Sequence, residues 1–580
     1  MNESVVSNDT WQWYKEVVLS WLEDPGTEEH GGLNMTALKM DQAYMIAGSD
    51  KDVGVYSVSD DCFRCPFELQ KTISAGSEEW WVISTVRQST WRVYSDYAEP
   101  FVTAGNTTGL VCQLRPNLGQ FGVYKLNASE EGCEFNTSKE PVDIYKPLLL
   151  LLGLLVAVWV LYGIVKLIMS RVRQTGKLRY GDKELAIQQR LRALDTFRGI
   201  AIVFMIFVND GAGGYWWLEH ATWNGLVAGD LVFPAFLWIM GVCIPLAIKS
   251  AFAKGIPRWK IILQIFRRSC MMFLLGMSLN TIYGSNMLQQ LRIFGVLQRL
   301  AVAYFIAAGF YALTAPKYYK PPRGACGQAL KDVLSCVWCW ALCAVLVAAH
   351  TAITFTVHHP DCPAGYLGPG GKHDDWIAPE CSGGAAGYLD RLLLGEAHLF
   401  QRSDARRVYG GPPTDPEGVL GCLTSAVQAL LGVQAGATVL LQRSHKARIS
   451  RWLAWALVFA LAGALLAGFS REHGVVPINK NLWSTSFVLV TSACCLALLS
   501  FCYTLTDAWR IWNGGPFRAP GLNAIALYVG HSVCAHLFPF HWKVPNMRTH
   551  TLSLIEAVWG TALWVIIAHI MAKKKVFITL

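Results

Sequence analysis

The chain has 580 residues, of which 53% are hydrophobic and only 16% are charged, and it contains 23 tryptophans. A water-soluble domain of this size rarely needs so many apolar side chains, so the composition indicates a membrane protein in contact with lipid. The formal net charge of +9 does not require a nucleic-acid partner. Lys and Arg occur in short clusters between apolar stretches, as they do in the cytosolic loops of membrane proteins. We therefore expect no nucleic-acid binding.

Residues 1–145 form a polar region with alternating apolar runs. Two of these runs, Trp80–Val86 and Trp91–Tyr97, are typical of β-strands. All the Asn-X-Ser/Thr sequons of the chain fall in this region, which places it in a lumen where N-glycans are added. We therefore expect a small, β-rich, glycosylated lumenal domain. The sequons lie at Asn2, Asn8, Asn34, Asn106, Asn127 and Asn136.

Four cysteines of this region, Cys62, Cys65, Cys112 and Cys133, are expected to form two disulfides in an oxidising lumen, with three possible pairings. The Cys-x-x-Cys spacing of the first two could instead mark a redox site or half of a zinc site. The domain has no second pair of this spacing and no cluster of His, so we favour structural disulfides. Residues 1–10 are polar and do not resemble a signal peptide. Either a signal has been removed or the first membrane helix translocates the domain.

Residues 146–580 consist of successive apolar stretches of about 20 residues, each enough to cross a hydrocarbon core roughly 30 Å thick. We predict a multi-pass α-helical membrane domain with about eleven spans. The spans are expected at 147–169, 197–217, 226–248, 262–282, 293–314, 333–356, 418–441, 452–469, 484–505, 519–538 and 552–572.

Basic residues cluster after the odd-numbered spans, and Lys573, Lys574 and Lys575 follow the last one. The positive-inside rule therefore predicts a lumenal N-terminal domain and a cytosolic C-terminus. A long loop near residues 358–417 is expected on the lumenal side. It contains Cys362 and Cys381, for which we predict a third disulfide.

The second span ends in a glycine-rich break that follows Asn209, and His220 and Glu219 come shortly after it. A broken helix at membrane depth is tolerated only where it is buried in protein or lines a cavity. His220 could act as a general base or as a nucleophile toward an acyl group, and Glu219 or Asp230 could orient its ring. The alternative is a hydrogen-bonded, inert histidine at the membrane interface.

Several stretches of the membrane domain resemble those of the heparan-α-glucosaminide N-acetyltransferase family. They are Asp195–Ala201, His220–Leu226, Asp230–Pro234, Arg292–Leu300, Cys362–Gly371, Gly383–Arg391, Asp415–Gly418 and Pro477–Ser484. The N-terminal domain is more loosely similar, through Leu38–Ala43 and its cysteines. The resemblance implies transfer of acetyl from cytosolic acetyl-CoA to the free amine of a terminal, non-reducing glucosamine of heparan sulfate in the lysosome. It also implies that His220 is the active-site histidine and Asn209 its neighbouring asparagine.

Coenzyme A carries phosphates, so a cationic site on the cytosolic side is expected. The candidates are Arg198, Arg267, Arg268 and Arg299. For the first three, the alternative role is anchoring by the positive-inside rule. Arg292 is seven residues from Arg299, so both are expected on one face of the fifth span, with Arg292 nearer the sugar.

The sugar side of the site is expected to include the acidic side chains of Glu219 and Asp230, together with Arg292, Asn479 and Lys480. No metal site is expected, and a homodimer is the expected assembly. A secondary transporter should show a repeat that relates its halves, and none is visible. A receptor would not need Asn209 and His220 at a helix break. The remaining alternatives are a multi-pass transporter and an acyltransferase that acts on another glycan.

Overall fold

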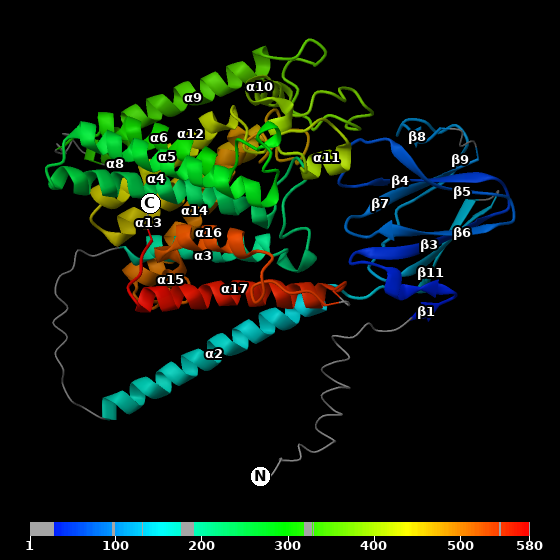
Figure 1. Cartoon of the computed structure of the whole chain (residues 1–580), viewed down its shortest axis with the longest axis horizontal. Helices are drawn as coiled ribbons and strands as arrows, with labels where there is room; N and C mark the ends of the chain where they lie inside the picture. Colours follow the sequence, from blue (N-terminus) through cyan, green and yellow to red (C-terminus); the bar gives the residue numbers. More distant parts are fainter. Residues whose placement is uncertain are drawn as a thin grey trace.

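The computed structural model describes residues 28–95, 99–129, 132–175, 191–317, 327–328, 330–544 and 547–578. A small β-rich domain lies beside a bundle of long helices, and helix α2 extends away from both (Figure 1). The sequons at Asn2 and Asn8 lie outside the described residues.

Two β-sheets packed against each other make up most of the N-terminal domain. The strand order is β11-β10-β3-β6 in the four-stranded sheet and β8-β5-β4-β7-β9 in the five-stranded sheet. One hydrophobic core contains Ala43 and Leu126 from the first sheet and Val55 and Trp91 from the second. The strands are β1 Glu29–His30, β2 Leu33–Asn34, β3 Gln42–Ser49, β4 Val53–Ser59, β5 Phe67–Ile73, β6 Glu78–Ser84, β7 Ser89–Tyr94, β8 Phe101–Val102, β9 Leu110–Leu114, β10 Val123–Ser129 and β11 Gly132–Lys139.

The two strands predicted from the sequence are confirmed as β6 and β7, which end at Ser84 and Tyr94, slightly earlier than expected. The alternation that revealed them has the period of a pleated strand, in which successive side chains point to opposite faces. Strand β10 shows the same pattern, because Leu126 and Ala128 are buried whereas Asn127 between them is exposed.

All six cysteines predicted to pair form disulfides. Cys62 bonds to Cys65 and Cys112 bonds to Cys133, which selects one of the three pairings that the sequence allowed. The second bond joins β9 to β11 and therefore ties the two sheets together. Cys362 bonds to Cys381, as predicted.

Nine helices among the described residues are long and apolar enough to cross a membrane. The prediction of a multi-pass helical membrane protein with a small β-rich domain is confirmed. All fifteen α-helices of the described residues are α2 Lys146–Thr175, α3 Arg192–Asn209, α4 Val232–Ala253, α5 Arg258–Tyr283, α6 Val296–Thr314, α8 Lys331–Leu334, α9 Val337–Thr356, α10 Gly384–Leu394, α11 Asp404–Tyr409, α12 Gly421–Leu441, α13 His445–Leu466, α14 Thr485–Tyr503, α15 Arg518–Leu522, α16 Ala524–Cys534 and α17 His550–Lys573. The nine that could cross a membrane are α2, α4, α5, α6, α9, α12, α13, α14 and α17.

The sequence predicts about eleven spans, and the second and the tenth of them are not among these nine helices. The sixth, expected at 333–356, is interrupted between α8 and α9. The second span, α3, ends at Asn209 instead of residue 217, because the glycine-rich segment turns away from the helix. The tenth span, expected at 519–538, is divided into α15 and α16 at Asn523. In α15, Gly521 lies so close to α3 that a Cβ atom on it would overlap the carbonyl oxygen of Asp195. The close contact with α3 therefore depends on a residue that also weakens the helix.

Helix α12 forms the centre of the bundle, and almost all of its residues are buried. It packs closely against α4 because small residues remove the side chains between the two backbones. A Cβ atom on Gly241 of α4 would overlap the carbonyl oxygen of Ala429, and one on Gly432 of α12 would overlap that of Trp238. These contacts hold α4 in place as one wall of the site described below.

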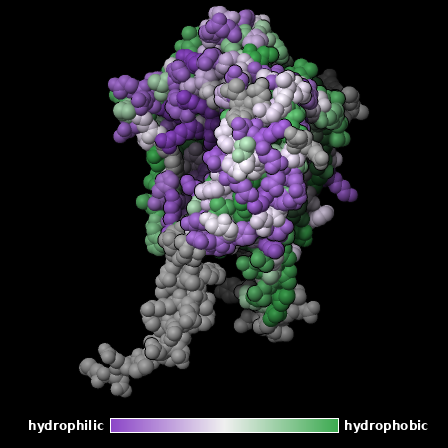
Figure 2. Space-filling model, turned by 90° about the vertical axis from the view of Figure 1, so that its right-hand side faces the viewer, coloured by the Kyte–Doolittle hydropathy of each residue, from purple (hydrophilic) through white to green (hydrophobic). Residues whose placement is uncertain are grey.

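Hydrophilic residues dominate the face that the β domain presents in Figure 2, whereas hydrophobic residues border this face and cover α2. Side chains such as Leu150, Trp159 and Leu161 on α2 are exposed. A helix that is apolar on all sides and exposed is suited to contact with lipid.

Candidate active site

The turn after α3 connects two of the predicted site residues, Asn209 and His220, which line the same cavity. Four consecutive residues, Gly211, Ala212, Gly213 and Gly214, have φ angles of 89°, 47°, 73° and 78°. Glycine adopts such left-handed conformations readily, so this composition allows the chain to reverse sharply after Asn209. The glycine-rich break expected from the sequence is therefore a turn, and it leads the chain toward His220.

His220 forms a compact cluster with Asp230 and Lys480. Its Nδ1 atom lies 3.0 Å from Oδ1 of Asp230 and 2.9 Å from Nζ of Lys480. The Asp230 side chain is fully buried, and its Oδ2 accepts hydrogen bonds from the backbone N–H groups of Ala221 and Val227. The side chain of His220 is 41% exposed. Because Nδ1 faces these partners, Nε2 is the ring atom left to meet a substrate.

Lys480 reaches this cluster from the loop before α14, and its Nζ atom also lies 3.3 Å from the Asp230 carboxylate. The neighbouring Asn479 is fully buried. Its Nδ2 donates a hydrogen bond to Oδ1 of Asn224 at 2.9 Å, and its Oδ1 accepts one from the N–H of Leu482 at 2.8 Å. Asn479 therefore joins two loops to each other, and Lys480 next to it faces His220.

A cavity of 870 Å³ extends from this cluster into the bundle, between α3, α4, α5 and α6. On α4 its wall includes Val232 near the start and Ala251 near the end, a separation of about 28 Å along a helix. The cavity therefore runs through most of the depth of the bundle. Asn209, His220 and Lys480 line one part of it.

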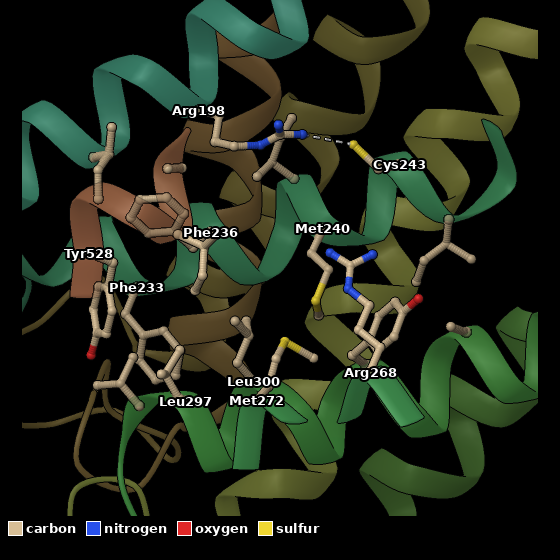
Figure 3. A pocket seen from close by; sticks show the side chains of 18 of the residues that line it. Arg198, Phe233, Phe236, Met240, Cys243, Arg268, Met272, Leu297, Leu300 and Tyr528 are labelled. Carbon is tan, nitrogen blue, oxygen red and sulfur yellow. Dashed lines mark hydrogen bonds between the residues drawn. The ribbon is translucent and has the colours of Figure 1, made fainter. Parts of the chain in front are cut away.

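Arg198, Arg267 and Arg268 also line this cavity. Figure 3 shows Arg198 on α3 and Arg268 on α5 pointing toward the cavity from opposite sides, with Met240 of α4 between them. The guanidinium of Arg198 donates to the carbonyl oxygen of Gly521 at 3.2 Å and to Sγ of Cys243 at 3.4 Å. Arg198 lies eleven residues before Asn209 on α3, so the cationic part is about 16 Å from the end of α3 near His220.

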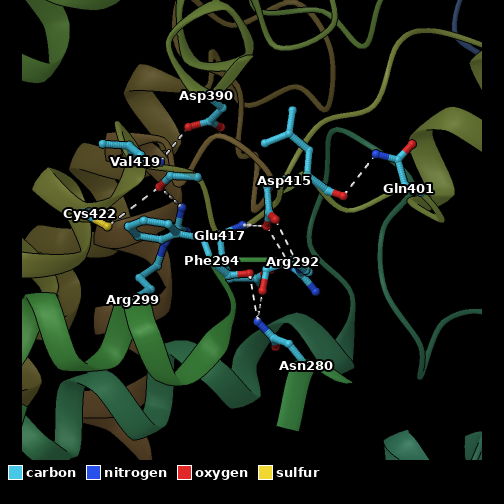
Figure 4. A network of polar contacts seen from close by, with 12 residues as sticks. Asn280, Arg292, Phe294, Arg299, Asp390, Gln401, Asp415, Glu417, Val419 and Cys422 are labelled. Atoms are coloured by element: carbon cyan, nitrogen blue, oxygen red, sulfur yellow. Dashed lines mark hydrogen bonds and ion pairs between the residues drawn. The ribbon is translucent and has the colours of Figure 1, made fainter. Parts of the chain in front are cut away.

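Arg292 and Arg299 belong to a different set of contacts, which Figure 4 shows. Helix α6 begins at Val296, so Arg292 precedes it, and the prediction that both residues lie on one face of this helix is wrong. The extended segment lets Arg292 reach Asp415 and Glu417, to which it donates at 2.6 Å each through Nη2.

Arg299 is buried, donates to the carbonyl oxygen of Gly418 at 2.8 Å and lies over the Trp483 ring. The cavity wall, within the described residues, includes neither Arg299 nor Arg292. Burial acts against the charge of Arg292, but the carboxylates of Asp415 and Glu417 raise the pKa of its guanidinium above the usual value. Both arginines therefore stabilise the loop before α12.

Glu417 lines the cavity together with His220 and Lys480, and the sequence analysis did not select it as a site residue. The sequence does contain a signal for Glu417, because this residue belongs to Asp415–Gly418, a stretch at the end of the long loop that resembles the family. The β domain also contributes to this region, which no local pattern in the sequence indicates. Oδ2 of Asp61 accepts a hydrogen bond of 2.9 Å from the hydroxyl of Thr222, two residues after His220.

Glu219 lies beside His220 but is not part of the cavity wall as far as the structure describes it. Desolvation and the negative charge of Asp404 raise the pKa of its carboxyl above the usual value. Asp230 also lies outside the wall and contacts His220 from behind.

A bundle of membrane-spanning helices, with a cavity that joins a cationic part to a histidine–carboxylate pair, is an arrangement suited to a membrane-embedded acyltransferase, and the comparisons with known proteins identify this class. Residues 190–320 match the family model described as "Heparan-alpha-glucosaminide N-acetyltransferase, catalytic". The chain is 36% identical over 592 aligned positions to the mouse heparan-alpha-glucosaminide N-acetyltransferase, covering 93% of this chain and 89% of the mouse protein. It is 35% identical over 595 positions to the human protein of the same name, covering 93% and 88%. The chain belongs to the heparan-α-glucosaminide N-acetyltransferase family.

Proposed function

We propose that this protein transfers the acetyl group of cytosolic acetyl-CoA to the amine of a terminal, non-reducing α-glucosamine of heparan sulfate in the lysosomal lumen. The observation that carries the proposal is the single cavity whose wall includes Arg198 and Arg268 in one part and His220 in another. The names of the mouse and human relatives support the reaction class. In this proposal the β domain faces the lumen and the C-terminus faces the cytosol.

The residues of the cavity fit acetyl-CoA, which supplies a thioester when bound. Arg198, Arg267 and Arg268 are suited to its phosphates, because guanidinium groups donate several hydrogen bonds to phosphate oxygens. The middle of the wall is apolar, with side chains such as Phe236 and Met240. It suits the thin, weakly polar arm of acetyl-CoA that lies between the phosphates and the thioester. A donor held with its phosphates near the arginines would direct its other end toward His220.

His220 is the proposed catalytic residue. The ammonium form of glucosamine has no free electron pair, so its amine must lose a proton to attack an acyl carbon. When Nδ1–H of His220 donates to Asp230, Nε2 has a free electron pair that can accept this proton. Lys480 is suited to stabilising the negative charge of Asp230 and to contacting the anionic glycan.

Asn209 is proposed to stabilise the negative charge that develops on the acyl oxygen. Its amide lines the same cavity as His220 and can donate a hydrogen bond. Two routes use the same groups. In one, His220 removes the proton while the amine attacks the acyl carbon and the thiolate of coenzyme A leaves. In the other, Nε2 of His220 attacks the acyl carbon and the thiolate leaves; the amine then attacks the acetyl group on Nε2, loses its proton and releases the free imidazole.

The test is acetyl transfer by the purified full-length protein with labelled acetyl-CoA and a glucosamine acceptor. We expect His220→Ala to lower kcat by about 10² to 10⁴, or by more if His220 carries the acetyl group. Binding of acetyl-CoA should persist, because the phosphates are held elsewhere. His359→Ala is the matched control, since His359 is exposed to a similar extent and lies outside the cavity wall described here. Near-normal activity of His220→Ala would disprove the assignment.

The two routes are separated by omitting the acceptor. Label that stays on His220 after incubation of the wild-type protein with labelled acetyl-CoA supports the two-step route, and its absence supports direct transfer.

Asp230→Asn tests the role of the carboxylate, because it keeps the shape of the side chain and removes the charge behind His220. We expect a lower kcat with little change in KM for acetyl-CoA.

A further inference from the structure

His550, the first residue of α17, lies buried between the β domain and the bundle. Figure 1 shows the N-terminal end of α17 directed at the β domain. The Nε2 atom of His550 is 2.9 Å from Oδ1 of Asp41, which precedes β3. Its Nδ1 atom is 2.8 Å from the carbonyl oxygen of Gly213, in the turn between Asn209 and His220. One imidazole therefore connects the β domain to the turn that leads to His220.

Both atoms that face this imidazole are hydrogen-bond acceptors. A carbonyl oxygen can only accept, and an ionised carboxylate can only accept. A neutral imidazole carries one N–H and can satisfy one of the two, so its free electron pair would face the other. The geometry is satisfied when the ring is an imidazolium, or when Asp41 carries the additional proton. In either form, the pair of Asp41 and His550 holds one proton more than a neutral ring beside a carboxylate.

The groups around His550 are consistent with a retained proton. Tyr215 stacks on the ring with centroids 4.7 Å apart, and its hydroxyl donates to the carbonyl oxygen of Ile144. Asp41 and Glu219 are the acidic groups that act on the ring electrostatically. Arg548 is the nearby basic residue on the same segment, and its guanidinium donates to the carbonyl oxygen of Met35.

The turn itself is in direct contact with the β domain. A Cβ atom on Gly214 would overlap the side chain of Met40, so this glycine permits the contact. Met40 and Asp41 both belong to Leu38–Ala43, the stretch that the sequence analysis selected in the N-terminal domain. The stretch that includes Met40 and Asp41 thus meets α17 and the active-site turn at one place.

We propose that Asp41 and His550 are positioning residues that fasten the active-site turn to the β domain only while their pair holds its additional proton. The proposal rests on the proposed function for its kinetic consequence. In an acidic lumen the proton is held and the carbonyl oxygen of Gly213 is bonded, which fixes residues 211–220. As the pH rises the proton is lost, a free electron pair faces an acceptor, and the turn is released from the β domain.

The isosteric variant Asp41→Asn tests this proposal directly. An amide can donate to Nε2 of a neutral His550, whose Nδ1–H still donates to Gly213. The contact in this variant therefore no longer needs the additional proton. His550→Ala removes the contact at every pH. Wild type, Asp41→Asn and His550→Ala should thus give three different responses to pH.

The first measurement is hydrogen exchange of peptides that cover residues 209–220, in the full-length protein in detergent, at about pH 5 and about pH 7.5. After correction for the intrinsic rate, we expect wild-type exchange to be on the order of tenfold faster at the higher pH. Asp41→Asn should stay protected at both values and His550→Ala should exchange rapidly at both. His569→Ala, at an exposed position of the same helix, should behave as wild type. If exchange in Asp41→Asn and in His550→Ala rose with pH as much as it does in the wild type, the proposal would be overturned.

The second measurement is the pH profile of kcat for acetyl transfer. We expect the decline of wild-type kcat toward neutral pH to be weaker in Asp41→Asn, whereas KM for acetyl-CoA should change little. Identical profiles would overturn the positioning role. If the wild-type protein transfers no acetyl but the exchange pattern follows the expectation, the proposed function fails and the proton-dependent contact stands. The two failures are therefore distinguishable.

Discussion

Single carboxyl groups near the site differ mainly in the partners that surround them. Asp415 and Glu417 are buried, and both are paired with Arg292. Asp390 is equally buried, and its Oδ1 accepts a hydrogen bond from the backbone N–H of Val419 at 2.8 Å. Burial raises the pKa of Asp390 to about 7. Burial dominates at Asp390, whereas at Glu417 the nearby positive charges, that of Arg292 first among them, outweigh burial and lower the pKa of the carboxyl.

The first prediction concerns the pH dependence of stability at Asp390. An unfolded aspartate titrates near pH 3.9, whereas the folded group titrates at about 7. Between these values the folded protein keeps a proton that the unfolded chain has released. The stability from this group is therefore complete below about pH 4 and is lost as the pH rises toward 7.

Asp390→Asn keeps the acceptor for Val419 and carries no charge, so it should unfold at a higher temperature than wild type at about pH 7.5. At about pH 4 the two proteins should unfold at similar temperatures. Thermal unfolding of the detergent-solubilised protein provides the measurement, with the exposed Asp361→Asn as the control. A variant less stable than wild type at both pH values would contradict the prediction.

Elements of the bundle are held together by small residues as much as by large ones. Helix α4 contributes to the cavity wall on one side and packs on α12 on the other. The distance between these two helices is therefore linked to the width of the cavity. Gly241 on α4 is the residue whose lack of a side chain permits the contact with Ala429.

The second prediction is that Gly241→Ala destabilises the protein by about 1–3 kcal/mol, because the added methyl group forces α4 away from α12. The control is Gly309→Ala on α6, where an added Cβ atom meets open space. Unfolding temperature and retention of the monodisperse protein on a sizing column provide the measurement. Equal stability of both variants would show that the helices tolerate the displacement.

The third prediction concerns the cationic part of the cavity. Arg268→Glu on α5 should raise the KM for acetyl-CoA by roughly ten- to a hundredfold, because a charge-assisted bond to phosphate becomes a repulsion. The KM for the glucosamine acceptor should change little. Arg443→Glu, an exposed position outside the described cavity wall, is the control. An equal loss for both substrates would indicate misfolding.

At the scale of the whole molecule, the β domain is joined to the membrane domain by specific contacts as well as by the chain. Asp61 bonds to Thr222, and the Cys62–Cys65 disulfide packs with Trp223 and Leu482 in one apolar cluster. The β domain therefore lies against both loops that form the cluster of His220 and Lys480.

The fourth prediction is that N-glycans occur only before Lys146. The side chains of Asn34, Asn106, Asn127 and Asn136 are all exposed, so each can accept a glycan. Enzymatic deglycosylation should lower the mass of an N-terminal fragment alone. Each Asn→Gln change should lower the mass of the untreated fragment by that of one glycan. A change at Asn286, which is outside any sequon, serves as the control. A glycan on a fragment beyond Lys146 would contradict the proposed orientation.

The sequence by itself determined the class of the protein and the presence of its main parts. Apolar runs of bilayer length predict spanning helices because lipid leaves the backbone no other partners, and confined sequons and paired cysteines predict a separate domain. His220 could be selected because it follows a glycine-rich break, and Asn209 because the surrounding stretches resemble the family. These are local patterns, and each depends on residues that are neighbours in the chain.

The tertiary structure alone decided which distant residues meet. It places Lys480 against His220, moves Arg292 and Arg299 into a separate network, and adds Glu417 to the cavity wall. It also ends α3 at Asn209, where the glycine-rich turn leaves the helix, and divides the tenth span at Asn523, where α15 packs closely on α3. The contact of Asp41 with His550 joins residues more than 500 positions apart. Pairings of this kind depend on how the helices and sheets pack, and no local periodicity carries that information.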